Sequence, residues 1–462
     1  MEDNNGIDVL VAGAGAAGCA AALAAAQAGR SVLLVDKSRY HLTASNTAMS
    51  TAMIPAAGSR WQAAAGIVDS PEVFLDDIRR KTRGTADPVL AQALAQVAPT
   101  LVAWLADDCG VPLELVTEFS YPGHSVTRCH AVADRAGATL LNYLMQAVRN
   151  QPLISLLVPA RLADVIVTDG AVTGGIIVSP DGQREEVPAR AVILATSGFA
   201  ANADLVARHL PEIAGAVHHG SEDSTGDALS IGERLGADTA FLDAYQGHGS
   251  LAVPHRVLVT WATVMHGGVL VNTDGQRFGD ETVGYSEFGA RVHAQPGHTA
   301  WVVFDERIHE AVLPFRDYQD CLRAGAIRRA ADVDELAALI GCPAAELANT
   351  LARAHDAATG QQPDPWGRTR WAGPIAAPYV AVRVAGALFH TQGGLRVNGN
   401  GQVLRAGEPI PGLYAAGGAA QGISGHGSAG YLAGNGLLPA LGLGYLAANH
   451  VSAQLSQTEG PQ

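Results

Sequence analysis

Short apolar runs that end at glycine-rich turns are the main pattern of this chain. The first run, residues 7–12, leads into the turn GAGAAG. An alanine-rich segment then separates it from a second run, residues 31–35, which ends at Asp36. Apolar runs this short are typical of strands buried in a parallel sheet, and the alanine-rich segment favours a helix. The pattern therefore predicts a strand, a tight turn, a helix and a second strand.

The glycines of the turn have the spacing of a dinucleotide-binding site. Gly13 permits the tight turn, Gly15 lets the backbone approach a pyrophosphate, and Gly18 lets the helix pack closely on the strand. The helix N-terminus offers free N–H groups and a partial positive charge to phosphates. Asp36 can accept hydrogen bonds from ribose hydroxyl groups. A glycine turn that binds nothing is the alternative, but the complete strand–turn–helix–strand–acid context favours the nucleotide site.

Two later apolar runs repeat this arrangement. The run at residues 191–195 ends in TSG, and the run at residues 410–416 ends in two glycines. A doubly wound α/β fold uses such strands to deliver small residues to the turns that hold a nucleotide. Between the two runs the pattern changes to mixed strands, loops and helices, which indicates an inserted domain. We expect a nucleotide-binding domain from residues 1–239 and 373–462, and an inserted domain from residues 240–372.

Composition narrows the class of protein. A chain of 462 residues is too long for one compact core, so two domains are expected. A formal net charge of −14 argues against a nucleic-acid partner or an anionic membrane surface. The apolar runs are too short or too interrupted to predict a membrane span. The five cysteines are scattered without a CxxC pair, so we expect no metal site, and with no signal-like N-terminus they favour the cytoplasm.

A polar stretch, residues 37–50, follows the second strand. It contains Ser45, Asn46 and Thr47, whose small hydroxyl and amide groups could hold a phosphate or the edge of a ring. An ordinary surface loop has the same composition, so this alternative stays open.

Two other segments carry candidate substrate ligands. Residues 118–130 concentrate one tyrosine, two histidines and one arginine on a non-regular segment. There Arg128 and His130 could bind a substrate carboxylate, with an ion pair between surface residues as the alternative. Near the C-terminus, Tyr431 precedes a glycine-rich helix start, so its side chain and several free N–H groups could converge on one ligand.

Six segments in this order resemble motifs of the flavoprotein superfamily of fumarate reductase, succinate dehydrogenase and the 3-ketosteroid dehydrogenases. They are GAGAAG, LATSGF, STGDAL, GGVLVNTDGQRF, HTQGG, and IPGLYAAGG followed by GYLAGNGLL. The resemblance implies an α/β fold in which a Rossmann-like FAD-binding domain is split in sequence by an α+β capping domain. It also implies hydride transfer between flavin N5 and a carbon next to an activated one. Because Tyr40 falls at the family's histidyl-flavin position, we expect the FAD to be bound non-covalently.

The resemblance assigns the FAD-binding residues to separate parts of the chain that contain glycines, small polar residues and helix starts. They are Gly13, Gly15, Ala16, Ala17, Gly18, Asp36, Lys37, Ser45, Asn46, Thr47, Ala160, Arg161, Thr196, Ser197, Gly198, Asp227, Gly417, Gly418, Asn435, Leu437 and Leu438.

The substrate positions depart from the fumarate reductases. Tyr285 stands where those enzymes carry the catalytic arginine, and Tyr431 stands where they carry a carboxylate-binding arginine. The places of their Glu/Arg proton relay fall on Trp261 and Val264. These replacements argue against fumarate reduction or succinate oxidation.

Two tyrosines at those places resemble the ketosteroid dehydrogenases. The resemblance implies that Tyr285 is the base on the carbon alpha to a ketone, and that Tyr431 and the Asn435 N–H bind the ketone oxygen. Tyr121 would assist the base. A phenol with a pKa of about 10 needs such help near neutral pH.

The family's two substrate-facing histidines match His248 and His390, which could also assist the base. The residues after Tyr431 differ from the motif of the ketosteroid dehydrogenases, and this chain is shorter than most of those enzymes. The substrate could therefore be a steroid or a smaller cyclic ketone such as 4-oxocyclohexanecarboxylate. The electron acceptor could be oxygen, a quinone or a protein. A reductase of enones or unsaturated acids, and an FAD-binding protein without turnover, are the remaining alternatives.

Overall fold

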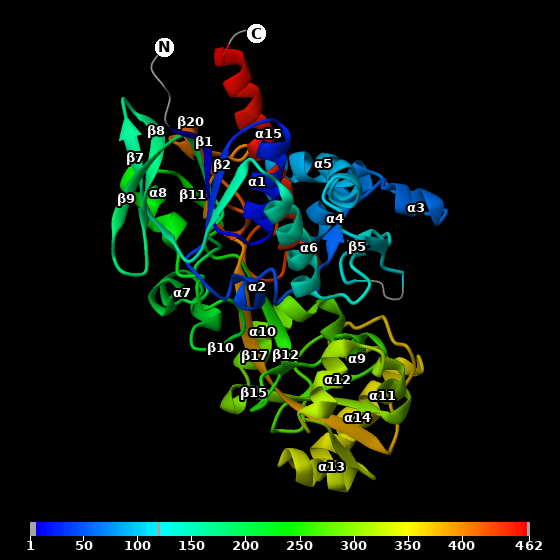
Figure 1. Ribbon diagram of the computed structural model, residues 1–462. Coiled ribbons are helices and arrows are strands. Elements are labelled where there is room, and N and C mark those ends of the chain that lie inside the picture. Colours follow the sequence, from blue (N-terminus) through cyan, green and yellow to red (C-terminus); the bar gives the residue numbers. More distant parts are fainter. Residues whose placement is uncertain (1–5, 118–120, 460–462) are drawn as a thin grey trace. The chain divides into compact units, whose positions relative to one another are not determined.

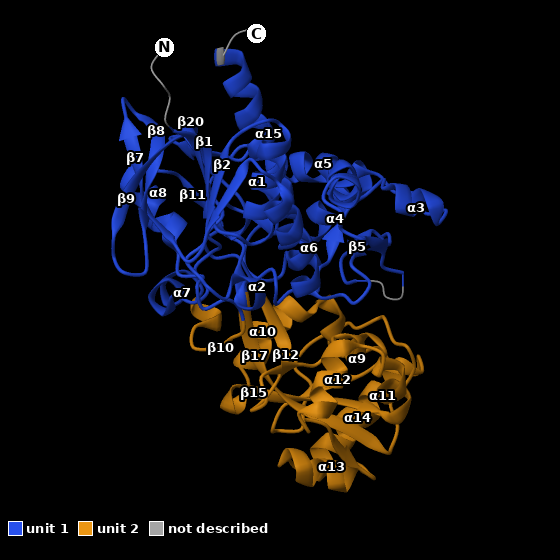
Figure 2. Cartoon of the chain, viewed as in Figure 1, with its two compact units in different colours: residues 1–210, 220–245, 390–462 blue, residues 211–219, 246–389 orange. Residues whose placement is uncertain are grey.

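The computed structural model describes residues 6–117 and 121–459, which form two compact units (Figures 1 and 2). Unit 1 comprises residues 1–210, 220–245 and 390–462, and unit 2 comprises residues 211–219 and 246–389. Each unit has its own main sheet. The chain is therefore an α/β protein whose first unit is interrupted in sequence by the second, as the split-domain prediction required.

Five parallel strands form the centre of the main sheet in unit 1, in the order β20–β9–β1–β2–β6. Their bounds are Glu408–Ala415, Arg184–Leu194, Ile7–Ala12, Val32–Val35 and Ile154–Leu157, and β19 (Gln402–Arg405) pairs antiparallel with β20. Ala12 lies opposite both Val35 and Leu194, and Leu194 lies opposite Ala415. The carboxyl ends of four strands therefore align at one edge, where a doubly wound sheet holds its ligand.

Helices α1 (Ala16–Gln27) and α15 (Leu437–Glu459) pack against each other in the core of unit 1 (Figure 1). A Cβ on Gly444 would lie 2.3 Å from the Ala17 carbonyl oxygen, so only glycine permits this approach. The other helices of unit 1 are α2 (His41–Ala44), α3 (Arg60–Ala64), α4 (Pro71–Lys81), α5 (Pro88–Asp107), α6 (Gly137–Asn150), α7 (Ala203–His209), α8 (Asp227–Leu235) and the 3₁₀ turn η4 (Gly417–Ala419).

The remaining strands of unit 1 are short or lie at the edge of the main sheet. β7 (Arg161–Thr168) and β8 (Ala171–Val178) form an antiparallel hairpin that continues into β9. The Asp169–Gly170 pair has positive φ at both residues, as a tight hairpin turn needs. Two small sheets contain β3 (Ile54–Pro55), β5 (Cys129–Ala131) and β4 (Glu114–Leu115), and β11 (Thr239–Ala240) with β18 (Gly394–Leu395).

Helix α5 is the one helix of the described chain that is long and apolar enough to cross a membrane by length and composition. The apolar runs of the sequence predict no such segment. Half of its most apolar window is buried, and α5 packs against α4 and α15. Core helices of globular proteins have the same length and composition, and this packing gives α5 a place in the core of unit 1.

Unit 2 is built on a sheet ordered β13–β12–β17–β15–β14, with β10 and β16 also pairing with β17. The strands are β10 (Val217–His218), β12 (Tyr245–Ala252), β13 (Val257–Leu258), β14 (Val269–Val271), β15 (Thr299–Asp305), β16 (Arg328–Ala330) and β17 (Tyr379–Thr391). The helices are α9 (Ala262–Met265), α10 (Tyr285–His293), α11 (Glu306–Val312), α12 (Arg316–Arg323), α13 (Val333–Ile340) and α14 (Ala344–Ala358), with 3₁₀ turns η1 (Pro211–Ile213), η2 (Glu281–Val283) and η3 (Pro296–His298).

The expected boundary at residues 372/373 falls inside unit 2. β17 pairs antiparallel with β15 from Tyr379 to Ala385, so this part of the chain is held by the sheet of unit 2. Residues 211–219 also belong to unit 2, because β10 pairs with β17. Strand pairing between distant segments determines both limits, and an apolar pattern read along the chain does not contain that information.

Candidate active site

The glycine turn after β1 is packed so tightly that it admits no side chain at Gly13 or Gly18. Gly13 has φ +109°, and a Cβ there would lie 2.2 Å from the Ala195 carbonyl oxygen at the end of β9. A Cβ on Gly18 would lie 1.7 Å from the Gly13 carbonyl oxygen. The turn and the helix–strand packing therefore have the geometry that the GxGxxG spacing predicts.

Two side chains from other segments contact this turn. Asp36, directly after β2, accepts a hydrogen bond from the Ala14 N–H at 2.7 Å. Thr47 accepts one from the Ala16 N–H at 2.9 Å through its hydroxyl oxygen. Ala160 also lies at this edge, since its N–H donates to the Asp36 carbonyl oxygen at 2.7 Å. Segments predicted separately as cofactor-binding therefore meet around one turn.

Two further pairs of residues that were predicted to bind FAD contact each other in unit 1. Asn46 donates through its amide nitrogen to the Ser197 hydroxyl at 2.9 Å. Lys37 forms an ion pair with Asp227 at 2.9 Å. All of the residues predicted to bind FAD lie in unit 1.

Unit 1 fits an FAD on two observations. The buried Thr196 hydroxyl and the buried Asn435 side-chain oxygen have no hydrogen-bond partner among the described residues, and a cofactor bound at this edge would supply one. Helix α1 also begins at the same edge, directly after the glycine turn, with N–H groups and a partial positive charge suited to phosphates.

Tyr431 and His390 border one glycine in unit 1. The ring centroids of the two side chains are 5.8 Å apart. A Cβ built on Gly436 would lie 3.1 Å from His390 Nε2 and 3.7 Å from the Tyr431 hydroxyl oxygen. The Gly436 N–H is a hydrogen-bond partner of that hydroxyl oxygen.

Burial controls the protonation of both side chains. Desolvation raises the pKa of Tyr431 far above its ordinary value, so the phenol stays protonated. Desolvation also lowers the pKa of His390 to about 4, so its ring is neutral at pH 7. Both side chains are therefore neutral at pH 7.

The Asn435 N–H does not have the predicted role in this structure. It donates to the Leu432 carbonyl oxygen at 3.0 Å, as part of the turn before α15. The amide that contacts the Tyr431 hydroxyl belongs to Gly436, one residue further on.

In unit 2, a buried ion-pair network supports the segment that precedes Tyr285. Arg277 donates to both carboxylate oxygens of Glu281, at 2.9 and 2.7 Å, and Arg368 donates to Glu281 at 3.0 Å. Gly284 follows with φ +130°, a conformation that side-chain-bearing residues rarely adopt. Tyr285 is then the first residue of α10. A negative charge on its phenol would lie near the positive end of that helix.

His248 stacks on Tyr285 instead of forming an in-plane hydrogen bond with it. The ring centroids are 4.8 Å apart at an interplanar angle of 17°, and Trp261 meets His248 edge-on at 5.8 Å. The Ser250 N–H donates to His248 Nδ1 at 3.2 Å, and burial lowers the pKa of His248 to about 3. The Ser250 hydroxyl, which donates to the Val259 carbonyl oxygen at 2.7 Å, also lies 3.1 Å from Nδ1. His248 is therefore a neutral ring stacked on Tyr285, and its assistance to the base stays a prediction.

Arg128 and His130 are buried side chains that a substrate does not reach. The Arg128 guanidinium is buried and donates to Asp69 at 2.9 and 3.1 Å and to Asp77 at 2.5 Å. His130 is also buried, with Nε2 2.7 Å from the Ser59 hydroxyl. Since two carboxylates already occupy the guanidinium, the predicted carboxylate-binding role of this pair is wrong.

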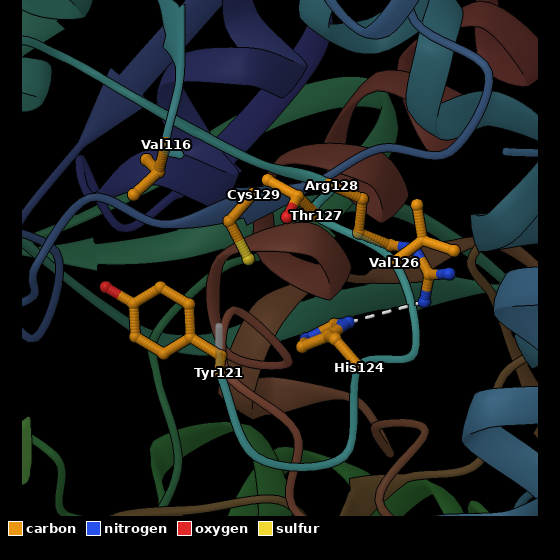
Figure 3. Close-up of a pocket in the computed structure, with 7 residues that line it drawn as sticks. All are labelled: Val116, Tyr121, His124, Val126, Thr127, Arg128 and Cys129. Carbon is orange, nitrogen blue, oxygen red and sulfur yellow. Dashed lines mark hydrogen bonds between the residues drawn. The ribbon is translucent and has the colours of Figure 1, made fainter. Parts of the chain in front are cut away.

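Arg128 instead supports the loop that carries Tyr431. It donates to His124 Nδ1 at 3.4 Å, and His124 Nε2 lies 3.0 Å from the Ala433 carbonyl oxygen. Figure 3 shows the His124–Arg128 pair with Tyr121 in the wall of one small pocket. Tyr121 is described, whereas residues 118–120 of the predicted ligand segment lie outside the described residues.

This arrangement predicts a stability effect for Arg128→Gln. The substitution leaves Asp69 and Asp77 buried without their cation, so we expect a loss of about 3–5 kcal/mol in the free energy of unfolding. Denaturant unfolding of the FAD-loaded protein measures it. Arg80→Gln is the matched control, because Arg80 pairs with Asp77 from a mostly exposed position and should cost about 1 kcal/mol or less. A wild-type unfolding curve combined with a raised KM for the substrate would contradict the supporting role.

Sequence reasoning missed Gln392, Ser424 and Gly436. Gln392 and Ser424 are hydrogen-bonded to each other and connect His390 to Asn435. Gln392 stands two residues after His390, inside a segment already singled out, so its position was a usable signal. Ser424 gave none, because its link to Gln392 depends on the folded loop.

The fold and the cofactor edge define an FAD-dependent oxidoreductase. The chain matches the family model described as FAD binding domain over residues 8–437, and it belongs to this family.

Relatives of the chain act on two kinds of substrate. The chain is 32% identical over 424 residues to the NADH:fumarate oxidoreductase of Klebsiella pneumoniae (strain 342); the match covers 90% of this chain but only 45% of that protein. It is 27% identical over 552 residues to the 4-oxocyclohexanecarboxylate 2-dehydrogenase of Sinomonas cyclohexanicum, covering 97% of this chain and 93% of the relative.

Solved structures show the same two branches. An open conformation of a flavocytochrome c3 fumarate reductase has a TM-score of 0.82 and 28% identity, covering 98% of this chain and 79% of that chain. The 3-ketosteroid-delta4-(5alpha)-dehydrogenase of Rhodococcus jostii RHA1 has a TM-score of 0.76 and 27% identity, covering 98% of each chain. The superfamily and the FAD cofactor predicted from the sequence are thereby confirmed.

Proposed function

We propose that this protein is an FAD-dependent dehydrogenase of a cyclic ketone, which it converts to the α,β-unsaturated ketone. The observation that carries the proposal is the neutral donor pair of unit 1. Tyr431 is a buried, protonated phenol whose ring centroid lies 5.8 Å from that of the neutral His390. Such a site suits the oxygen of a ketone, whereas a carboxylate there would lack a counter-charge.

The ketone oxygen would accept a hydrogen bond from the Tyr431 hydroxyl. Removal of a proton beside a ketone places negative charge on that oxygen, and a preorganised donor stabilises this charge more than the starting ketone. The Gly436 N–H, a partner of the Tyr431 oxygen, would hold the phenol in place for this role.

Tyr285 would remove the alpha proton, and FAD when bound would accept the hydride from the beta carbon. The substrate then loses one proton and one hydride, and a C=C bond forms between the two carbons. Gly284 and the Arg277–Glu281–Arg368 network hold Tyr285 at the start of α10. Tyr285 belongs to unit 2 and Tyr431 to unit 1, so each proposed role can be tested by its own variant.

The cofactor would be held at the edge described above, with the phosphates at the glycine turn and α1, and the ribose at Asp36. Thr196 and Asn435 supply the polar atoms that lack partners within the protein. The electron acceptor that reoxidises the flavin stays open among oxygen, a quinone and a protein.

Reduction of an unsaturated acid of the fumarate type is the second candidate. The similarity to the fumarate oxidoreductase and to the flavocytochrome c3 structure favours it. Tyr285 and Tyr431, at the places of the family's two arginines, count against it.

Anaerobic mixing of the FAD-loaded protein with separate substrates tests the proposal. Loss of the visible absorbance of oxidised flavin with 4-oxocyclohexanecarboxylate or a 3-ketosteroid is the expected result, and the faster of the two identifies the ring size. Bleaching by succinate, or rapid reoxidation of reduced flavin by fumarate but by no enone, would favour the second candidate. No reaction with any of these would leave FAD binding without turnover.

A further inference from the structure

A chain of buried side chains leads from the start of α15 to His390. Asn435 donates through its amide nitrogen to the Ser424 hydroxyl at 3.3 Å, and Ser424 donates to Gln392 Oε1 at 2.9 Å. Gln392 Nε2 then lies 3.2 Å from His390 Nδ1. Gln392, Ser424 and Asn435 are all buried within unit 1. The chain therefore connects a residue of the FAD edge to a ring nitrogen of the substrate histidine.

The direction of this chain determines where the His390 proton lies. Because Gln392 Oε1 accepts from Ser424, its NH₂ group faces His390, and a donor can face Nδ1 only if Nδ1 carries no proton. The proton of the neutral ring is then on Nε2. The Thr391 carbonyl oxygen, 3.3 Å from the same Nδ1, would favour the opposite tautomer.

The side chain of Asn435 indicates that the hydrogen bonds run from Asn435 through Ser424 to Gln392, and not in the opposite direction. In that direction the Asn435 side-chain oxygen has no partner within the described chain. If these hydrogen bonds ran in the opposite direction, the Asn435 NH₂ group would instead lack a partner. Buried donors without partners are rarer than buried acceptors, and a free oxygen can accept from a bound cofactor.

We propose that the His390 Nε2–H and the Tyr431 hydroxyl together donate to the ketone oxygen, and that Gln392 and Ser424 are positioning residues that fix the His390 tautomer. The two donor groups border the same glycine, Gly436. The donation to a ketone rests on the proposed function. The tautomer of His390 and its control by Gln392 do not depend on the proposed function.

Nitrogen NMR of the FAD-loaded protein, labelled with ¹⁵N only at histidine, tests the inference. The His390 signals are identified by their absence in His390→Asn. At pH 7 we expect wild-type His390 to carry its proton on Nε2. His248, which lies in unit 2, serves as an internal reference whose signals neither Gln392→Glu nor Ser424→Ala should change.

Gln392→Glu reverses the group that faces Nδ1, because a carboxylate accepts and cannot donate. We expect Nδ1 of His390 to become protonated, His248 to keep its signals, and flavin reduction by a ketone to slow about tenfold or more. Ser424→Ala releases Gln392 Oε1 without a charge change, and it should give a mixture of the two His390 tautomers. Ser424→Ala tests the control of the His390 tautomer if Gln392→Glu does not fold.

A wild-type His390 protonated on Nδ1 would overturn the inference, as would a tautomer that neither variant changes. An Nε2-protonated His390 that responds to Gln392→Glu, in a protein that reacts with no ketone, would instead overturn the proposed function. The positioning role of Gln392 would then stand.

Discussion

Replacing Tyr431 by phenylalanine is expected to slow flavin reduction by a cyclic ketone by about 100- to 1000-fold, the usual cost of one donor to a developing oxyanion. The substitution removes the hydroxyl proton aimed at the ketone oxygen and keeps the ring. Because Tyr431 Oη accepts from Gly436 N–H, the loss is confined to this small cluster. Anaerobic stopped-flow absorbance measures the rate.

Tyr414→Phe is the matched control. Tyr414 is also a buried tyrosine of unit 1, but its hydroxyl lies 3.0 Å from His450 Nδ1 and donates to Gln454 at 3.2 Å. Its removal should leave the reduction rate within about twofold of wild type, because neither partner belongs to the proposed site. A Tyr431→Phe rate within the same range would remove Tyr431 from the mechanism.

Tyr285→Phe is expected to slow the same reaction by about 100- to 10,000-fold, the usual contribution of a general base. The FAD content should stay unchanged, since all of the predicted cofactor-binding residues lie in unit 1 and Tyr285 lies in unit 2. The stack with His248 depends on the ring, which phenylalanine retains. The rate of flavin bleaching and the flavin-to-protein ratio measure the two effects.

Tyr318→Phe provides the comparison within unit 2. Tyr318 is buried and its hydroxyl lies 2.5 Å from His309 Nδ1. Loss of that contact should lower stability without slowing flavin reduction. Equal rates for Tyr285→Phe and Tyr318→Phe would show that Tyr285 is not the base.

The cofactor half of the fold could be predicted from the sequence because its signals are local. The run at residues 7–12 is β1, and the spacing of Gly13 and Gly18 requires contacts with backbone only a few residues away or on the neighbouring strand. Asp36 lies beside the turn because a parallel strand of fixed length brings it there. Each of these features follows from periodicity and backbone geometry.

The errors lie where side chains far apart in sequence pair with each other. For Arg128 the sequence left a carboxylate ligand and an ion pair as alternatives, because its partners, Asp69 and Asp77, precede it by many residues and show no pattern with it. His248 stacks on Tyr285 of α10, a contact that the sequence positions of the two residues do not indicate. Such pairings depend on tertiary packing, which a single sequence does not specify.

The substrate can be tested most directly by mixing the oxidised, FAD-loaded wild-type protein anaerobically with 4-oxocyclohexanecarboxylate and, separately, with succinate. The neutral donor pair of Tyr431 and His390 predicts rapid bleaching of the flavin by the ketone and none by succinate. Bleaching by succinate without bleaching by the ketone would contradict the account.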